Sequence, residues 1–137
     1  MEQKLKTIKI IHLAIVLGVS VGYYVLGHIT SLDQITKLPH ITKDSIIYAI
    51  IPLAAVIISS VLFRIKLQKI DNSLSFEEKL EPYQAASVMR WAILEGAAFF
   101  LIILKPTFIT LGIILIVYIL LLRPIESKIK RDLKHID

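Results

Sequence analysis

The sequence contains no cysteine, and only 20% of its 137 residues are charged, against about 25% in an ordinary soluble domain. The absence of cysteine excludes disulfides, thiolate nucleophiles and cysteine-ligated metals. The sequence also lacks a G-x-S-x-G turn, a Walker loop, a glycine-rich dinucleotide turn and an H-E-x-x-H motif. We therefore expect a protein that is not an enzyme and that holds no metal and no cofactor.

Hydrophobic residues are abundant, at 55% of the chain, and the mean hydropathy is +0.72. They are concentrated in long runs. A core of this size cannot bury such runs, because a chain this short leaves roughly a third of its unfolded surface exposed. This composition also excludes a disordered chain. The sequence therefore predicts a small multi-pass membrane protein whose principal partner is the lipid bilayer.

Four apolar runs are candidates for membrane spans, at residues 10–27, 46–63, 85–104 and 107–122. A hydrocarbon core of about 30 Å needs roughly 20 helical residues. The fourth run is slightly short, but the long side chain of Arg123 can reach water and extend it. The expected fold is all-α: a four-helix transmembrane antiparallel bundle with an amphipathic C-terminal tail helix, forming a single membrane domain over residues 1–137.

The distribution of positive charge predicts the orientation of the bundle. The N-terminal tail, the loop 64–82 and the tail 123–137 carry twelve Lys and Arg residues, whereas the opposite side carries three. Because positive charge favours the cytoplasmic side, we expect both termini in the cytoplasm. The net charge of +5 flanks the apolar runs, so no nucleic-acid partner is expected. The first run is longer than the apolar region of a signal peptide, which favours its retention as a span.

The connecting segments carry local signals. Ser75 and Glu78 have the spacing of a capping box, which predicts a short cytoplasmic helix from about Phe76. Pro82 is expected either to kink that helix or to start the third span. The outer loop 28–44 is expected to be irregular, with Asp44 or Ser45 capping the second helix. Its two histidines, His28 and His40, are interpreted as solvated residues rather than metal ligands.

The tail after Pro124 is the clearest amphipathic segment. Its apolar positions recur at spacings of four, four and three residues, with basic residues between them: Ile125, Ile129, Leu133 and Ile136. We expect this basic helix to rest on anionic lipid headgroups, and the alternative is that it docks onto a partner.

Small residues recur every four positions in two of the spans, at Ala14, Gly18 and Gly22 and at Ala92 and Gly96. Small side chains allow the backbones of two membrane helices to approach closely. We expect them to pack within the monomer. A homodimer seam is the alternative.

Arg90 and Glu95 are the ionisable residues within the third span, where a charge is costly and usually has a role. Five residues correspond to about 140° around a helix, so the two side chains do not share a face and each needs partners on other helices. The expected partners, by depth in the membrane, are His12, Ser20, Ser59, Ser60 and Tyr118. With few donors near it, the carboxyl of Glu95 is a candidate for a neutral or proton-carrying group.

The pattern R-W-A-x-x-E-G-A at residues 90–97, after an acidic amphipathic loop, resembles a group of short, uncharacterised four-helix bacterial membrane proteins. The likeness is strongest over residues 76–99, and it implies a four-span topology in a bacterial inner membrane but no activity. Two functional hypotheses follow. In the first, the chain is an accessory, assembly or structural subunit that packs against a membrane-protein partner or forms a homo-oligomer. In the second, it is a proton-coupled small transporter subunit that uses Glu95.

Overall fold

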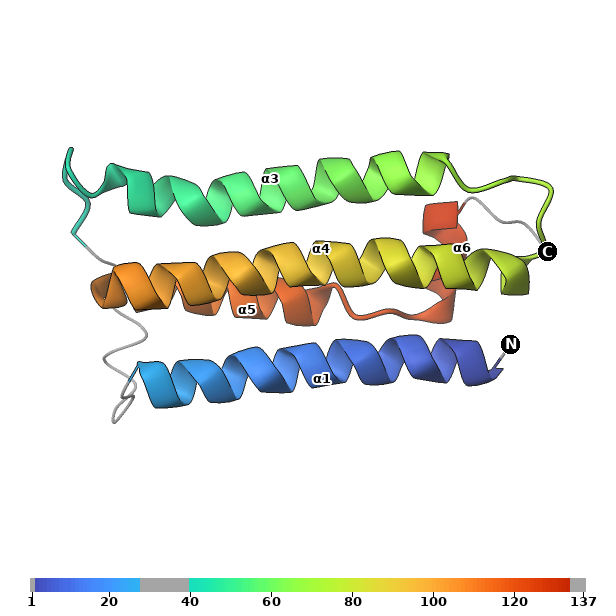
Figure 1. The fold of residues 1–137 in the computed structure, drawn as a ribbon, viewed down its shortest axis with the longest axis horizontal. Coiled ribbons are helices and arrows are strands. Elements are labelled where there is room, and N and C mark those ends of the chain that lie inside the picture. Colours follow the sequence, from blue (N-terminus) through green and yellow to red (C-terminus); the bar gives the residue numbers. More distant parts are fainter. Residues whose placement is uncertain (1, 28–39, 134–137) are drawn as a thin grey trace.

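The computed structural model describes residues 2–27 and 40–133 (Figure 1). Within these ranges the structure is all-α. Its helices are α1 (Glu2–Leu26), α3 (Ile46–Gln68), α4 (Phe76–Leu104), the 3-10 turn η1 (Pro106–Phe108), α5 (Ile109–Leu121) and α6 (Glu126–Leu133). Most of the expected outer loop, including His28, and the last tail position, Ile136, lie outside the described residues.

Three of these helices, α1, α3 and α4, are long and apolar enough to cross a membrane. The chain is therefore a multi-pass integral membrane protein. The fourth run forms η1 and the 13-residue α5, which is too short to meet the same criterion alone. The axis then bends by 88° into α6. The described chain thus holds three packed candidate spans, and it has a fourth if η1 and α5 also cross the membrane.

Helix α4 is the centre of the bundle and contacts α1, α3 and α5 (Figure 1). Helices α1 and α4 run in the same direction, whereas α3 and α5 run in the opposite direction. One end of the bundle holds the start of α1, the end of α3, the start of α4 and all of α6. Because the cationic side chains gather there, we call it the basic end.

The starts of the helices differ in part from the expected boundaries. The capping box is confirmed: Ser75 Oγ accepts a hydrogen bond from Glu78 N at 3.2 Å, and Glu78 Oε1 accepts one from Ser75 N at 3.4 Å. The short cytoplasmic helix expected from about Phe76 is instead the start of α4, a single 29-residue helix with Pro82 inside it, so the expectation that Pro82 starts the third span is wrong. Ser45 is the residue before α3 but makes no capping bond; its Oγ instead accepts from Thr42 N at 2.9 Å.

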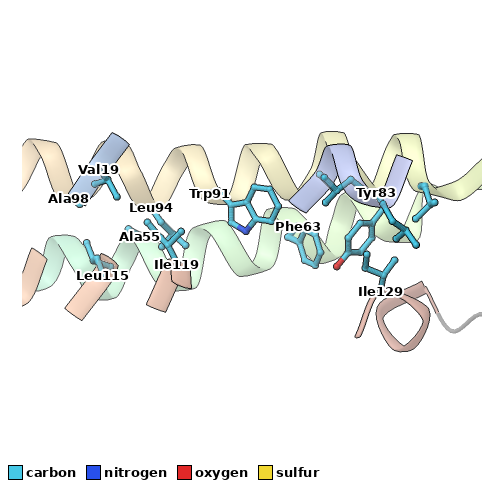
Figure 2. Close-up of a cluster of buried hydrophobic side chains, with 14 of the residues drawn as sticks. Val19, Ala55, Phe63, Tyr83, Trp91, Leu94, Ala98, Leu115, Ile119 and Ile129 are labelled. Atoms are coloured by element: carbon cyan, nitrogen blue, oxygen red, sulfur yellow. The ribbon is translucent and has the colours of Figure 1, made fainter. Parts of the chain in front are cut away.

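The core follows one face of α4, where buried residues recur at spacings of three and four: Leu80, Tyr83, Ser87, Trp91, Leu94, Ala98 and Leu101. Figure 2 shows this face meeting side chains from α1, α3 and α5, such as Val19, Ala55 and Ile119. Large apolar residues on the outward faces, such as Leu53 and Val61, are exposed. That distribution suits a bundle surrounded by hydrocarbon rather than by water.

The amphipathic tail helix forms as expected, but its apolar face does not point to lipid. Ile129 and Leu133 of α6 are buried against the bundle. Tyr83 of α4 donates a hydrogen bond to Asp132 Oδ2 at 2.9 Å, and Ile129 lies beside Tyr83 (Figure 2). The apolar face of residues 126–133 therefore packs against the start of α4, and contact of the basic face with lipid headgroups stays a prediction.

Candidate functional site

The two ionisable residues of α4 face different neighbours. Arg90 contacts α3, where its guanidinium lies 3.7 Å from the centre of the Phe63 ring. Glu95 lies one turn before Phe99, whose ring packs beside Tyr23 of α1. Arg90 and Glu95 form no salt bridge with each other. They therefore belong to two separate regions, which are described in turn.

Arg90 is part of an aromatic and charged cluster at the basic end. The Phe63 ring beneath its guanidinium meets the Tyr83 ring edge-on, with 5.7 Å between the ring centres. Tyr83 in turn donates to Asp132. A guanidinium over an aromatic face is stabilised by about 0.5–2 kcal/mol, more when water is excluded. This cluster joins α3, α4 and α6.

The expected partners of Arg90 occupy other roles. Ser59 Oγ donates to the carbonyl of Val56 in its own helix at 3.2 Å. Ser60 lines a cleft together with Arg90. Tyr118 is half-buried at the edge of the core. Among the described residues, Arg90 Nε has no hydrogen-bond partner. Phe63 and Tyr83, which sequence reasoning did not select, are the contacts that position it.

A cleft of about 1090 Å³ lies at the basic end. Its walls come from α3, the loop that follows it, α4 and α6: Ser60, Phe63, Arg64, Leu67, Gln68, Asn72, Leu74, Lys79, Arg90, Asp132 and Leu133. Three of these side chains are cationic and one is a carboxylate, so the lining has a net charge of +2. Lys79 is only 5% exposed, which is rare for a lysine without a bound partner.

His12 of α1 has a structural task. Its Nε2 lies 2.8 Å from the carbonyl oxygen of Ile119, and a carbonyl can only accept, so Nε2 carries the proton and donates. Its ring meets Trp91 at a centroid distance of 4.9 Å. His12 was expected at about the level of Arg90, and its contact with Trp91 puts it there, but its hydrogen bond goes to the end of α5.

That end of α5 is fully capped. The last four carbonyls of a helix have no partner within it. Those of α5 bond to four different donors: Leu122 N reaches Tyr118, His12 reaches Ile119, Arg123 N reaches Leu120, and Lys128 Nζ reaches Leu121 at 2.8 Å. Because lipid supplies no donors, this capping is what lets the helix end after 13 residues.

Glu95 lies on the flank of α4 that faces α1. A methyl group added to Gly22 of α1 would lie 2.7 Å from Phe99 Cζ, so these two residues are in direct contact. The two helices run in the same direction. Glu95 lies one turn before Phe99, and Gly18 lies one turn before Gly22, so Glu95 and Gly18 are at the same level. A methyl group added to Gly18 meets no described atom within 4 Å. The packing between α1 and α4 therefore leaves space beside the carboxyl of Glu95.

Most of the small residues selected from the sequence are left uncovered by the described helices. Ala14, Gly18, Ala92 and Gly96 are all exposed, and a methyl group on Gly96 would also meet no described atom within 4 Å. Of the five, Gly22 alone is packed against a neighbouring helix, and Ser20 is half-buried on α1. The expectation that the whole set packs within the monomer therefore holds for Gly22 and not for the other four.

Within residues 2–27 and 40–133, no group of three or more His, Asp or Glu side chains is placed to hold a metal ion. His40 is exposed there. Comparisons of the chain with protein-family models, with curated protein sequences and with solved structures find no match. No family is identified, and the resemblance noted over residues 76–99 stays an expectation.

Proposed function

We propose that the chain is a non-enzymatic accessory or assembly subunit, whose α1–α4 face binds a transmembrane helix of another membrane protein. The observation that carries the proposal is the exposure of Ala14, Gly18, Ala92 and Gly96 on neighbouring helices. Intramolecular packing leaves these positions open. Membrane helices associate through such small residues, because close backbone approach supplies the packing energy that the hydrophobic effect cannot.

Glu95 gives this face a polar centre. It lies near the middle of the span expected over residues 85–104, at the level of Gly18 and beside Gly96. A carboxyl at that depth is costly unless a partner satisfies it. A donor on an incoming helix would meet that need, while the neighbouring glycine would admit its backbone. The tail is not assigned to the partner, because Ile129 and Leu133 are already buried against the bundle.

The proposed topology has four spans, with η1 and α5 as the fourth and both termini in the cytoplasm of a bacterial inner membrane. The alternating directions of α1, α3, α4 and α5 support this arrangement. So does the charge bias of twelve against three. Together η1 and α5 rise about 25 Å, a few ångströms less than a bilayer core, and Lys105 and Arg123 flank them. Long cationic side chains at both ends make up that difference by reaching toward water.

Enlarging the small residues tests the proposed face. Gly18→Leu and Gly96→Leu each add four carbons where the monomer has space. In a strain that needs this protein, both should abolish function while the purified variants keep the wild-type melting temperature. The matched control is Val61→Phe, which also adds four carbons, at an exposed position of α3 away from this face. Full function of both leucine variants would refute the proposed interface.

A second candidate function, a proton-coupled transporter subunit, is favoured by one observation. Glu95 has no hydrogen bond or ion pair with any described residue, and it is half-exposed on the seam. Glu95→Gln separates the two functions. An amide keeps the shape and can donate a hydrogen bond, but it cannot exchange a proton at working pH. Wild-type function of Glu95→Gln together with loss in Glu95→Ala supports the accessory role; loss in both stably folded variants supports the transporter.

A further inference from the structure

The cleft at the basic end has the features of a binding site and takes no part in the proposed helix interface. It is lined by residues of α3, α4 and α6, whereas the exposed small residues belong to α1 and α4. Its volume of about 1090 Å³ is large enough for a small polar ligand.

The cations that line the cleft outnumber its carboxylate by three to one. Lys79 is 5% exposed and makes no salt bridge with a described residue, and the carboxylate of Asp71 interacts with it electrostatically without forming an ion pair. Arg90 directs its guanidinium onto the Phe63 ring, and its Nε has no described hydrogen-bond partner. The one carboxylate of the lining, Asp132, already accepts from Tyr83. An anion that accepts hydrogen bonds would complete the cleft.

The depth of the cleft in the membrane indicates which kind of anion it binds. Arg64 directly follows the apolar run 46–63 of α3, and Lys79 precedes the span at 85–104. Both therefore lie at the depth of lipid headgroups. The anionic group abundant at that depth is phosphate, and its oxygens suit the donors of arginine and lysine. Phe63 and Leu67 give the cleft an apolar wall beside these donors.

We propose that this cleft binds a phosphate group through Arg64 and Lys79, with Arg90 adding positive charge deeper in the cleft and Asp132 holding α6 in place as the third wall. The group comes either from an anionic lipid headgroup or from free phosphate. Helix α6 forms one edge of the cleft. The hydrogen bond between Asp132 and Tyr83 holds that helix, with Asp132 and Leu133, at this edge.

Ligand titrations on the full chain in detergent micelles test the proposal. Phosphatidylglycerol, phosphatidylcholine and inorganic phosphate are added separately at equal ionic strength, with melting temperature and apparent affinity as readouts. A rise with phosphatidylglycerol and not with phosphatidylcholine identifies the lipid as the source. A saturable rise with inorganic phosphate identifies the free anion. If none of the three raises the melting temperature, the proposal is overturned.

Paired variants distinguish the cleft from general surface charge. Arg64→Gln with Lys79→Gln removes two lining cations and should weaken the binding by at least about tenfold, because each removes a charge-assisted hydrogen bond. Lys66→Gln with Lys69→Gln removes the same charge from exposed positions nearby that do not line the cleft, and should bind like the wild type. Equal loss in both pairs would overturn the proposal. Arg64→Gln alone, at an exposed residue, keeps the test decisive if the Lys79 variant does not fold.

Discussion

Replacing Gly112 with alanine should destabilise the bundle, because this glycine of α5 faces the ring of Tyr23. An added methyl carbon would lie 2.5 Å from Tyr23 Cζ and 2.7 Å from its Cε2. Carbon atoms pack best at about 3.5–4.0 Å. The ring has little freedom to move, since Tyr23 is buried and its hydroxyl donates to the carbonyl of Ala98.

The expected cost of Gly112→Ala follows from these contacts. Overpacking a closely packed site costs about 1–3 kcal/mol. If the ring moves to make room, it also gives up its hydrogen bond, which in a membrane protein adds about 0.6 kcal/mol. Gly18→Ala and Gly96→Ala are matched controls in neighbouring helices, where the same methyl meets no described atom within 4 Å. Alanine also favours a helix over glycine by up to about 1 kcal/mol, so these controls should be neutral or stabilising.

The lone tryptophan provides the assay. Trp91 is 1% exposed and contacts the ring of His12, so its fluorescence should change when the bundle opens. Unfolding of the three alanine variants is followed by this signal in the same detergent. Tyr23→Leu removes the overlapping ring, so combining it with Gly112→Ala should cost less than the sum of the two single changes. Equal melting temperatures for Gly112→Ala and Gly18→Ala would refute the α1–α5 packing described above.

Four further outcomes are expected. His12→Leu removes the donor to the carbonyl of Ile119 and should lower stability by about 1–3 kcal/mol, the cost of a buried polar group left without its partner; a melting temperature equal to wild type would show that this carbonyl finds another donor. Arg90→Leu should lower stability by about 0.5–2 kcal/mol through loss of its contact with Phe63, while Lys66→Leu, at an exposed position, should change it little. Hydrogen bonds from Ser73 N and Oγ hold the pKa of Asp71 below its usual value, so the loop stability that this carboxylate supplies is present above pH 4 and lost as the pH falls through the lowered pKa; the melting temperatures of wild type and Asp71→Ala should therefore converge on acidification. Topology reporters fused after residue 137 and within residues 28–39 should report opposite sides of the membrane, and the same side for both would contradict the proposed four spans.

The long helices could be predicted because hydrophobic length is a local property of the sequence. The capping box at Ser75 and Glu78 is local too, and it placed the start of α4 correctly. Whether the helix continues through Pro82 could not be predicted from the local sequence in the same way. A proline in the second turn of a helix lacks an N–H and crowds the preceding turn, and whether the helix continues depends on what its flanks pack against. Here Lys79, Leu80 and Tyr83 around it are all buried.

The cleft was missed because its residues come together only when α4 is continuous. Lys79 and Arg90 are eleven residues apart, which is about three turns and returns to nearly the same face of one helix. With Pro82 expected to kink this helix or to start the third span, Lys79 was counted only as a cytoplasmic charge. The small residues could be found from the sequence, but their packing partner could not. Their spacing shows that they share a helix face, and spacing alone does not say whether that face packs against a helix of the same chain or of another protein.

The contacts of His12 connect the core of the bundle to the cleft. By donating to Ile119, His12 helps α5 to end where it does, and Lys128 of α6 completes the same cap at Leu121. The chain then turns by 88°, which carries α6 across the basic end instead of along the membrane. That direction lets Asp132 reach Tyr83 and places the edge of α6 over Lys79 and Arg90. A buried histidine in the first helix thus helps to place α6, which forms one wall of the cationic cleft between α3, α4 and α6.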